Sequence, residues 1–179
     1  MRITLASFLA AIVLFLSGFL WWGFLMPIAM PAKVLQDDAL AEQIITSLTE
    51  PGLYIYPDYT SQEHAATSML FYNSEPPPML AIMGAGFLHM FASALFISLV
   101  VSRLEIASTS GRIAMVSSFG CFVAWWANVG HLIWWRHPYS WTAFHVAYDI
   151  SSWVLAGIVI ALIVKPATAI SDVATEHAS

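Results

Sequence analysis

W-W-A-N-V-G-H-L-I-W-W-R-H-P-Y-S-W-T-A-F-H-V-A-Y-D, the stretch from Trp125 to Asp149, joins the end of one apolar run to the start of the next. The connection between the two runs is short, so the runs are predicted to form an antiparallel helical hairpin. Five tryptophans, three histidines, one asparagine and one aspartate fall within this stretch. Because polar side chains inside an apolar run cost desolvation free energy, this hairpin is the first place to look for functional residues.

The composition of the whole chain is that of a membrane protein. Of its 179 residues, 59% are hydrophobic and only 9% are charged, whereas soluble domains carry roughly 25% charged residues. The net charge is −5 and no basic stripe with interleaved aromatic residues is present, which argues against a nucleic-acid partner. The single cysteine, Cys121, lies inside an apolar run and has no second cysteine with which to form an intramolecular disulfide.

Four apolar runs are long enough to cross the hydrocarbon core of a bilayer, which takes about 20 helical residues. The sequence therefore predicts an all-α integral membrane protein, organised as one membrane domain that contacts the lipid bilayer. The predicted transmembrane helices cover residues 3–30, 79–102, 113–135 and 141–164, and a polar tail covers residues 165–179.

The first run has some features of a signal peptide, because it begins Met-Arg and is followed by A-M-P-A ending at Ala32. Its apolar part is much longer than the roughly 7–15 apolar residues of a secretory signal. Trp21 and Trp22 also lie near its far end, where interfacial tryptophans are enriched. We therefore expect this run to be a retained transmembrane helix.

Residues 31–78 form a long connection between the first and second transmembrane helices. Within Val34–Thr49, four apolar residues fall on one face at helical spacing, which predicts a short amphipathic helix. This helix is expected to lie on the membrane surface, and a docking helix for a partner is the alternative. Leu53–Tyr56 has strand propensity and ends at Pro57, which predicts a short extended stretch or one arm of a hairpin.

Lysine and arginine are distributed unequally between the two sides of the predicted bundle, four against two. The positive-inside rule counts these residues near the helix ends. It places both the N- and C-termini in the cytoplasm and residues 31–78 on the outer side. The four basic residues on the cytoplasmic side are Arg2, Arg103, Arg112 and Lys165, and the two on the outer side are Lys33 and Arg136.

Histidine, asparagine and aspartate side chains fall inside three of the predicted helices. His89 lies near the middle of the second helix, and Asn128 and His131 are neighbours on one face of the third. His145 and Asp149 share one face of the fourth helix at a spacing of four residues. At 1.5 Å per residue, His131 and His145 lie about 6 Å below the ends of their helices and Asp149 about 12 Å. The hairpin can therefore bring these residues together in the outer half of the bundle, and His89 would join them if its helix faces the cluster.

This cluster has three interpretations. The first is a structural polar network of Asn128, His131, His145 and Asp149 that fixes the register of the hairpin and needs no cofactor. The second is a cofactor site, in which His131, His145 and Asp149 ligate a divalent metal such as zinc or iron. In another form of the second interpretation, His89, His131 and His145 bind a cofactor such as haem, which two facing histidines can ligate axially. The third is a pathway for protons or a small ligand.

The tryptophans around the cluster are typical of an aromatic belt. Trp134, Trp135 and Trp141 fall near the predicted outer interface, where tryptophan is enriched for physical reasons alone. An aromatic-lined pocket for a quinone or a lipid is the alternative interpretation.

Three stretches carry a resemblance to a known class of proteins. They are G-F-L-W-W-G-F-L at Gly18–Leu25, W-W-R-H-P at Trp134–Pro138 and A-Y-D-I-S-S-W-V-L-A-G-I-V-I-A-L at Ala147–Leu162. The chain resembles small bacterial inner-membrane proteins with four helices, which form a domain-of-unknown-function class. The resemblance covers the first helix and the final third of the chain, and residues 31–78 are longer than in the simplest members. It implies a four-helix architecture in a bacterial inner membrane and no particular reaction.

Function is predicted from what the chain lacks as well as from what it contains. The chain is small, shows no nucleophile–base pattern and has no soluble catalytic domain. We therefore expect a non-enzymatic accessory or assembly component of a membrane complex, with a membrane-protein partner or a second copy of itself. One alternative is a metal-, haem- or quinone-binding redox protein that uses the His/Asp cluster, and another is a small proton-coupled transporter unit.

Overall fold

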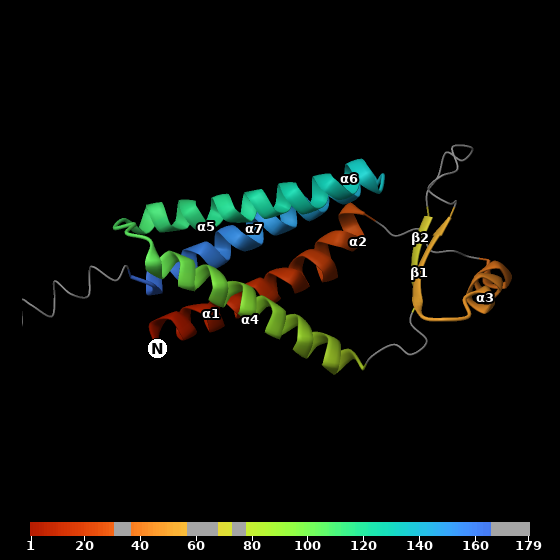
Figure 1. Ribbon diagram of the computed structural model, residues 1–179, viewed down its shortest axis with the longest axis horizontal. Coiled ribbons are helices and arrows are strands. Elements are labelled where there is room, and N and C mark those ends of the chain that lie inside the picture. The colour runs from red at the N-terminus through yellow and green to blue at the C-terminus, as the bar shows by residue number, and fades with distance from the viewer. Residues whose placement is uncertain (31–36, 57–67, 73–77, 166–179) are drawn as a thin grey trace, which may run out of the picture. The chain divides into compact units, whose positions relative to one another are not determined.

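The computed structural model describes residues 1–30, 37–56, 68–72 and 78–165 (Figure 1). The chain divides into two compact units, Met1–Met30 together with Leu80–Ser179, and Pro31–Met79. The first unit contains four helices that are long and apolar enough to cross a membrane, and each falls on one of the predicted runs. These helices cover Arg2–Ala29, Met79–Arg103, Thr109–Trp134 and Tyr139–Ile163.

The first and third of these helices are interrupted by π-helical segments. The first consists of α1 (Arg2–Gly18), η1 (Phe19–Leu25) and α2 (Met26–Ala29). The third consists of α5 (Thr109–Ala124), η2 (Trp125–Val129) and α6 (Gly130–Trp134), whereas α4 (Met79–Arg103) and α7 (Tyr139–Ile163) are continuous. Because π-helical turns are rare and are frequently found at functional sites, these two segments mark where to look for one.

Helix α7 is the centre of the first unit, since it packs against both α5 and α1 (Figure 1). Small residues make these contacts close. A Cβ on Gly157 would lie 3.2 Å from the Val116 side chain of α5. Toward α1, the buried hydroxyls of Ser17 and Ser152 share a hydrogen bond of 2.6 Å. Such small and hydroxylated residues are typical of contacts between helices in lipid, where backbones must approach closely to gain dispersion energy.

The apolar core lies toward the end of the unit where the α4–α5 connection is found. It is built mostly from alanine, valine and isoleucine, and long aromatic side chains are absent from its fully buried members among the described residues. From α1, α4, α5 and α7 it takes Ala6, Ala10, Leu14, Ala94, Ile97, Val101, Val116, Ala156, Ile160 and Val164.

Arg112 is buried at this same end and is only 5% exposed. The sequence predicts it to be a flanking residue just before a helix that starts at residue 113. In the structure α5 begins earlier, at Thr109, because the Ser108 hydroxyl caps it by accepting a hydrogen bond of 3.1 Å from the Gly111 N–H. Arg112 is therefore a residue of the first turn, and its guanidinium points into the protein.

Helix α4 buries residues fully only in its second half, although Phe87 in its first half packs edge-to-face on Phe8 and Phe15 of α1. Its buried residues are Ala94, Ile97, Ser98 and Val101. Toward Met79 the helix crosses α1 at an angle and diverges from the other helices (Figure 1). Only 11% of its most apolar stretch is buried, against 33% for the first helix. One face of the first half of α4 is therefore unpartnered in the described part of the chain.

The second unit contains one helix and one two-stranded sheet. Helix α3 (Asp38–Ser47) is capped by the Asp37 carboxylate, which accepts a hydrogen bond of 3.0 Å from the Leu40 N–H. It falls within the predicted amphipathic helix, of which Val34–Gln36 lie outside the described residues. Strands β1 (Gly52–Tyr56) and β2 (Ser68–Tyr72) pair antiparallel, with Gly52 opposite Tyr72 and Tyr56 opposite Ser68.

The helical expectation holds for the first unit, and the extended stretch expected between the first two long helices is one strand of a sheet in the second unit. The stretch Leu53–Tyr56 is extended as predicted, but its partner strand β2 was not identified from the sequence. A strand of five residues gives a weak signal alone and acquires its conformation from the ladder hydrogen bonds of its partner.

Candidate functional site

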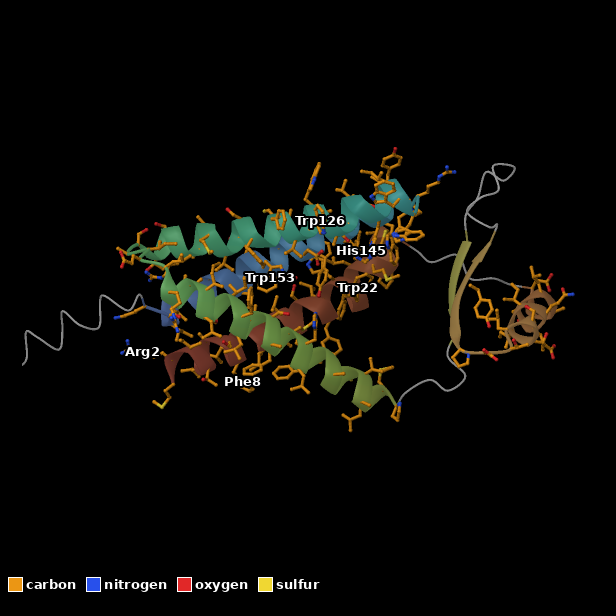
Figure 2. All side chains as sticks on the ribbon, in the orientation of Figure 1. Arg2, Phe8, Trp22, Trp126, His145 and Trp153 are labelled. Carbon is orange, nitrogen blue, oxygen red and sulfur yellow. The ribbon has the colours of Figure 1, made fainter. Side chains whose placement is uncertain are left out.

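The half of the bundle toward the α6–α7 connection has an interior of polar and aromatic side chains instead of an apolar core. Figure 2 shows Trp22 of η1 and His145 of α7 lying close together there. We use the name polar–aromatic cluster for the six residues that meet in this half. They are Trp22, Asn128, Trp141, His145, Tyr148 and Asp149.

Both π-helical segments contribute a side chain to this cluster. Asn128 of η2 is 8% exposed, and its amide donates a hydrogen bond of 2.7 Å to Oδ2 of Asp149. The same amide donates a second bond, of 3.0 Å, to the Ala124 carbonyl one turn earlier. Because the amide is held by its own helix as well, it presents one fixed donor to the carboxylate of α7. This contact is one part of the network predicted from the sequence.

His145 lies among aromatic rings. The centroid of its imidazole is 4.5 Å from that of Trp141 and 4.8 Å from that of Trp22. Its Nε2 atom is buried and has no hydrogen-bond partner among the described residues. The rings of Trp22 and Trp141 occupy the space beside the imidazole, so His145 is positioned by aromatic packing and retains one free polar atom.

Tyr148 connects the cluster to a groove between η1 and α4. Its ring lies 5.8 Å from that of Trp22, and its hydroxyl would be 3.6 Å from a Cβ placed on Gly18. The groove has a volume of about 320 Å³ and exists because the first half of α4 diverges from the bundle. Aromatic residues, methionines and glycines line it, including Phe15, Phe19, Trp22, Met83, Met90 and Tyr148.

His131 is exposed and lies beside His137 at the α6–α7 connection. The two imidazole centroids are 5.2 Å apart, and the His137 N–H donates to the His131 carbonyl at 3.4 Å. Arg136 between them has φ 53°, the left-handed conformation that commonly ends a helix. Burial lowers the pKa of His137 below its ordinary value of 6.5, and the nearby charge of His131 lowers this pKa further.

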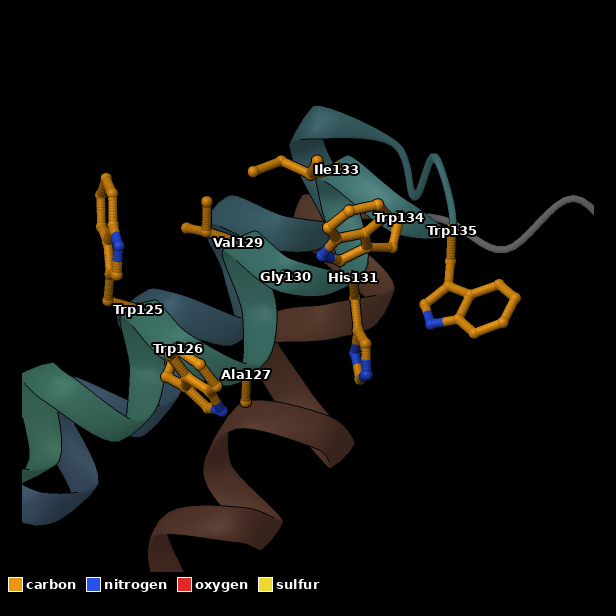
Figure 3. Close-up of a pocket in the computed structure, with 9 residues that line it drawn as sticks. All are labelled: Trp125, Trp126, Ala127, Val129, Gly130, His131, Ile133, Trp134 and Trp135. Carbon is orange, nitrogen blue, oxygen red and sulfur yellow. The ribbon is translucent and has the colours of Figure 1, made fainter.

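A second hollow of about 570 Å³ lies on the outer surface of the third helix. Its nine lining residues all come from the stretch Trp125–Trp135, so a single helix forms its wall, and His131 is one of them (Figure 3). Trp125, Trp126 and Trp134 project from this helix and are 67%, 74% and 79% exposed. A wall of one helix encloses no ligand, and of these three tryptophans only Trp134 is one that the sequence predicts to lie in an aromatic belt.

The predicted cofactor ligands are not brought together. The described residues contain no group of three histidine, cysteine, aspartate or glutamate side chains that could hold a metal. Of the proposed ligands, His145 and Asp149 lie on the same face of α7, whereas His131 is exposed on α6. His89 is exposed on α4 and therefore does not enter the cluster. The reason is that α4 diverges at this depth, which its sequence does not reveal.

Trp22 and Tyr148 were not identified as site residues from the sequence. The sequence predicts Trp22 to lie in an aromatic belt, but in the structure its ring contacts four rings of α7, those of Trp141, Phe144, His145 and Tyr148. The sequence does contain a pattern that predicts this face of α7. Trp141, His145 and Tyr148 are spaced by four and then three residues, which places them on one side of a helix. That spacing places Tyr148 and His145 on one face of α7, but it does not show that this face packs against the first helix.

No protein-family model, no curated protein and no solved structure matches the chain.

Breaking the bond between Asn128 and Asp149 is expected to destabilise the protein. Asn128→Leu and Asp149→Leu should each lower the free energy of unfolding by about 1 to 3 kcal/mol. Each substitution removes one side of the bond and leaves the other side chain without this partner in the interior of the protein. The double variant should lose less than the sum of the two, with a coupling of about 1 to 2 kcal/mol. Unfolding in mixed micelles measures the free energy of unfolding of the wild type, the two single variants and the double variant.

The Ser17–Ser152 pair supplies the matched comparison for this cycle, because it is a buried bond between neutral groups. Its coupling is expected to be smaller, about 0.6 kcal/mol. Additive losses at Asn128 and Asp149 would contradict the assignment of the bond.

The α6–α7 connection is expected to lose stability when the pH falls below 6.5, the ordinary pKa of histidine. The pKa of His137 is lowered in the folded protein, so the unfolded chain takes up the proton first and is favoured as the pH falls. Well above pH 6.5 the residue is neutral in both states and contributes no pH dependence. The titration of the His137 ring protons by NMR measures the shift.

Replacing His131 with glutamine separates the two causes of this shift. The pKa of His137 should rise only part of the way toward 6.5, because burial is the larger cause and remains. A complete return to 6.5 would show that charge repulsion alone is responsible.

Proposed function

We propose that this protein is a non-enzymatic integral membrane subunit that packs through α4 against a transmembrane helix of another membrane protein. The observation that carries this proposal is the exposed face of α4. Ala85, His89 and Ala92 lie on that face and are exposed, and a Cβ on Gly84 would meet nothing within 4 Å. The positive-inside rule places the α4–α5 end in the cytoplasm.

His89 is the residue that most favours a partner helix. It is the eleventh residue of α4, so it lies about 15 Å along a helix of membrane length. An imidazole exposed to hydrocarbon at that depth loses its hydrogen bonds to water, and residues of this kind normally face a partner. The small residues on either side of His89 allow another helix backbone to approach, so that a polar group on the partner can bond the imidazole.

Photo-crosslinking in native membranes tests this proposal. A photoreactive residue at Ala85 is expected to give an adduct with one other membrane protein. A residue at Leu162, which is 65% exposed on α7, is expected to react with lipid only. His89→Leu should lower the yield at Ala85 by roughly 3-fold to 30-fold, as the loss of one hydrogen bond within a membrane would.

Two outcomes would overturn the proposal. Reaction of Ala85 with lipid alone would show that α4 faces the bilayer. An adduct consisting only of two copies of this chain would replace the accessory subunit with a homo-oligomer.

A second candidate function is supported by the groove between η1 and α4. We propose that it binds a lipid-soluble quinone, because its walls are aromatic and apolar and the Tyr148 hydroxyl can donate to a quinone carbonyl. Tyr148→Phe should weaken binding of a short-chain quinone analogue by about 2-fold to 10-fold, the cost of one hydrogen bond. Tyr139→Phe is the control, since Tyr139 is 82% exposed at the start of α7. Equal affinity in the two variants, or no saturable binding, would exclude this function.

A further inference from the structure

The end of the bundle opposite the polar–aromatic cluster contains a cavity lined by basic side chains. Its volume is about 440 Å³, and it lies where the start of α1, the end of α4 and the residues after α7 converge. Arg2, Arg103 and Lys165 line it, and all three are exposed. Met1, Ile3, Ser102 and Val164 form the rest of its wall.

This cavity gathers a large share of the basic residues of the chain. The sequence has six lysines and arginines in all, and three of them line this one cavity. None of the described lining residues is an aspartate or glutamate, so no carboxylate in the cavity wall neutralises them. Three like charges around one cavity repel one another, and this repulsion is relieved when an anion enters.

Favourable interactions with helix dipoles account for the positions of two of the three basic residues but not for that of the third. Arg103 is the last residue of α4 and Lys165 follows the end of α7, and cations are favourable at helix C-termini. Arg2, however, is the first residue of α1, where the dipole is positive. The first turn of α1 contains no acidic residue and no side-chain cap, so its N–H groups are also free to bind an anion.

The position of the cavity identifies the kind of anion. It lies at the ends of three helices that are long and apolar enough to cross a membrane, which is the depth of phospholipid headgroups. Ile3 and the buried Val164 form the apolar part of its wall. We propose that this cavity binds the phosphate of an anionic phospholipid, with Arg2, Arg103 and Lys165 as its ligands. This site is independent of the α4 partner proposed above.

Lipid retention by the full-length protein tests the site. The protein is reconstituted in vesicles of phosphatidylcholine with a minority of phosphatidylglycerol, extracted gently, and its bound phospholipid is quantified by mass spectrometry. The wild-type protein is expected to retain phosphatidylglycerol in preference to phosphatidylcholine. The variant Arg2→Gln/Arg103→Gln/Lys165→Gln should lower this preference by roughly tenfold or more, and added salt should lower it in the wild type.

Arg136→Gln is the matched control, because Arg136 is an exposed arginine at the opposite end of the bundle. It should leave the preference unchanged. An equal loss in this control, or an undiminished preference in the triple variant, would overturn the proposal. Inorganic phosphate added to lipid-free protein in detergent is expected to give no rise in melting temperature, and a rise that the triple variant abolishes would assign the cavity to a soluble anion instead.

Discussion

Replacing Arg112 with methionine is expected to lower the free energy of unfolding by about 3 to 5 kcal/mol, the largest effect of any substitution considered for this protein. The guanidinium is buried and donates five hydrogen bonds, all to oxygen atoms of neutral groups. Two of them, at 3.0 and 3.2 Å, reach the Ala161 carbonyl in the last turn of α7. The others reach the carbonyls of Ile106 and Ala107 and the hydroxyl of Thr109, at 2.8 to 3.1 Å.

The physical reason for so large an effect is that Arg112 joins three elements at once. It satisfies a carbonyl at the C-terminal end of α7, where the helix dipole favours a cation, and it holds the α4–α5 connection against α5. Methionine preserves the packing of the side-chain stem but leaves these carbonyls without donors in a buried position.

Arg112→Lys should recover less than half of this loss. An ammonium has three donors on a flexible stem, whereas the planar guanidinium reaches groups on two sides at once. Unfolding of the protein in neutral detergent measures these differences. Arg103→Met is the control, because Arg103 is exposed at the same end of the bundle, and its effect should stay within about 0.5 kcal/mol. Similar losses at Arg103 and Arg112 would contradict the role assigned to the buried bonds.

Replacing Gly120 with alanine is expected to lower the free energy of unfolding by about 3 kcal/mol, even though alanine is the better helix former. A Cβ at this position would overlap the Cβ of Trp153 and lie 2.9 Å from its Cγ. The Cβ of Trp153 is fixed by the backbone of α7, so the clash cannot be relieved by rotating the indole. Helices α5 and α7 would have to move apart along the most extensive contact of the bundle.

Two other glycines provide a graded comparison measured by the same unfolding experiment. Gly157→Ala should cost less, because its Cβ would lie 3.2 Å from the Val116 side chain, which can shift slightly. Gly130→Ala should be neutral or stabilising by up to about 1 kcal/mol, since nothing lies within 4 Å of its Cβ and glycine is costly in a helix. A different order of the three variants would show that the α5–α7 distance is not set by these contacts.

The polar–aromatic cluster shows which contacts a sequence can predict. The approach of Asn128 to Asp149 follows from the short α6–α7 connection, which makes the two helices antiparallel neighbours and matches their depths. No such connection links His145 to Trp22, which are separated by most of the chain. Their contact depends on which face α1 turns toward α7, and this is decided by the small residues that pack between them, such as Ser17 and Ser152.

His89 and Arg112 show where prediction from the sequence fails, because the exposure of each side chain differs from what its position in the sequence suggests. His89 sits in the middle of an apolar run and yet is exposed, since α4 leaves the bundle along its first half. Arg112 sits in a polar connection and yet is buried, since the cap at Ser108 starts the helix one turn earlier. In both residues the side chain is placed by how a helix begins or crosses, which periodicity does not encode.

The sequence alone determined that the chain has four helices of membrane length, where they lie, and that the third and fourth form a hairpin. These features follow from local properties, namely the length of an apolar run and the shortness of a connection. Tertiary structure alone decided which side chains share the interior of the Trp125–Asp149 hairpin, that α4 diverges to leave a groove, and that three basic residues converge on one cavity. Those features depend on the crossing and rotation of helices distant in sequence, which are set by side-chain packing between them.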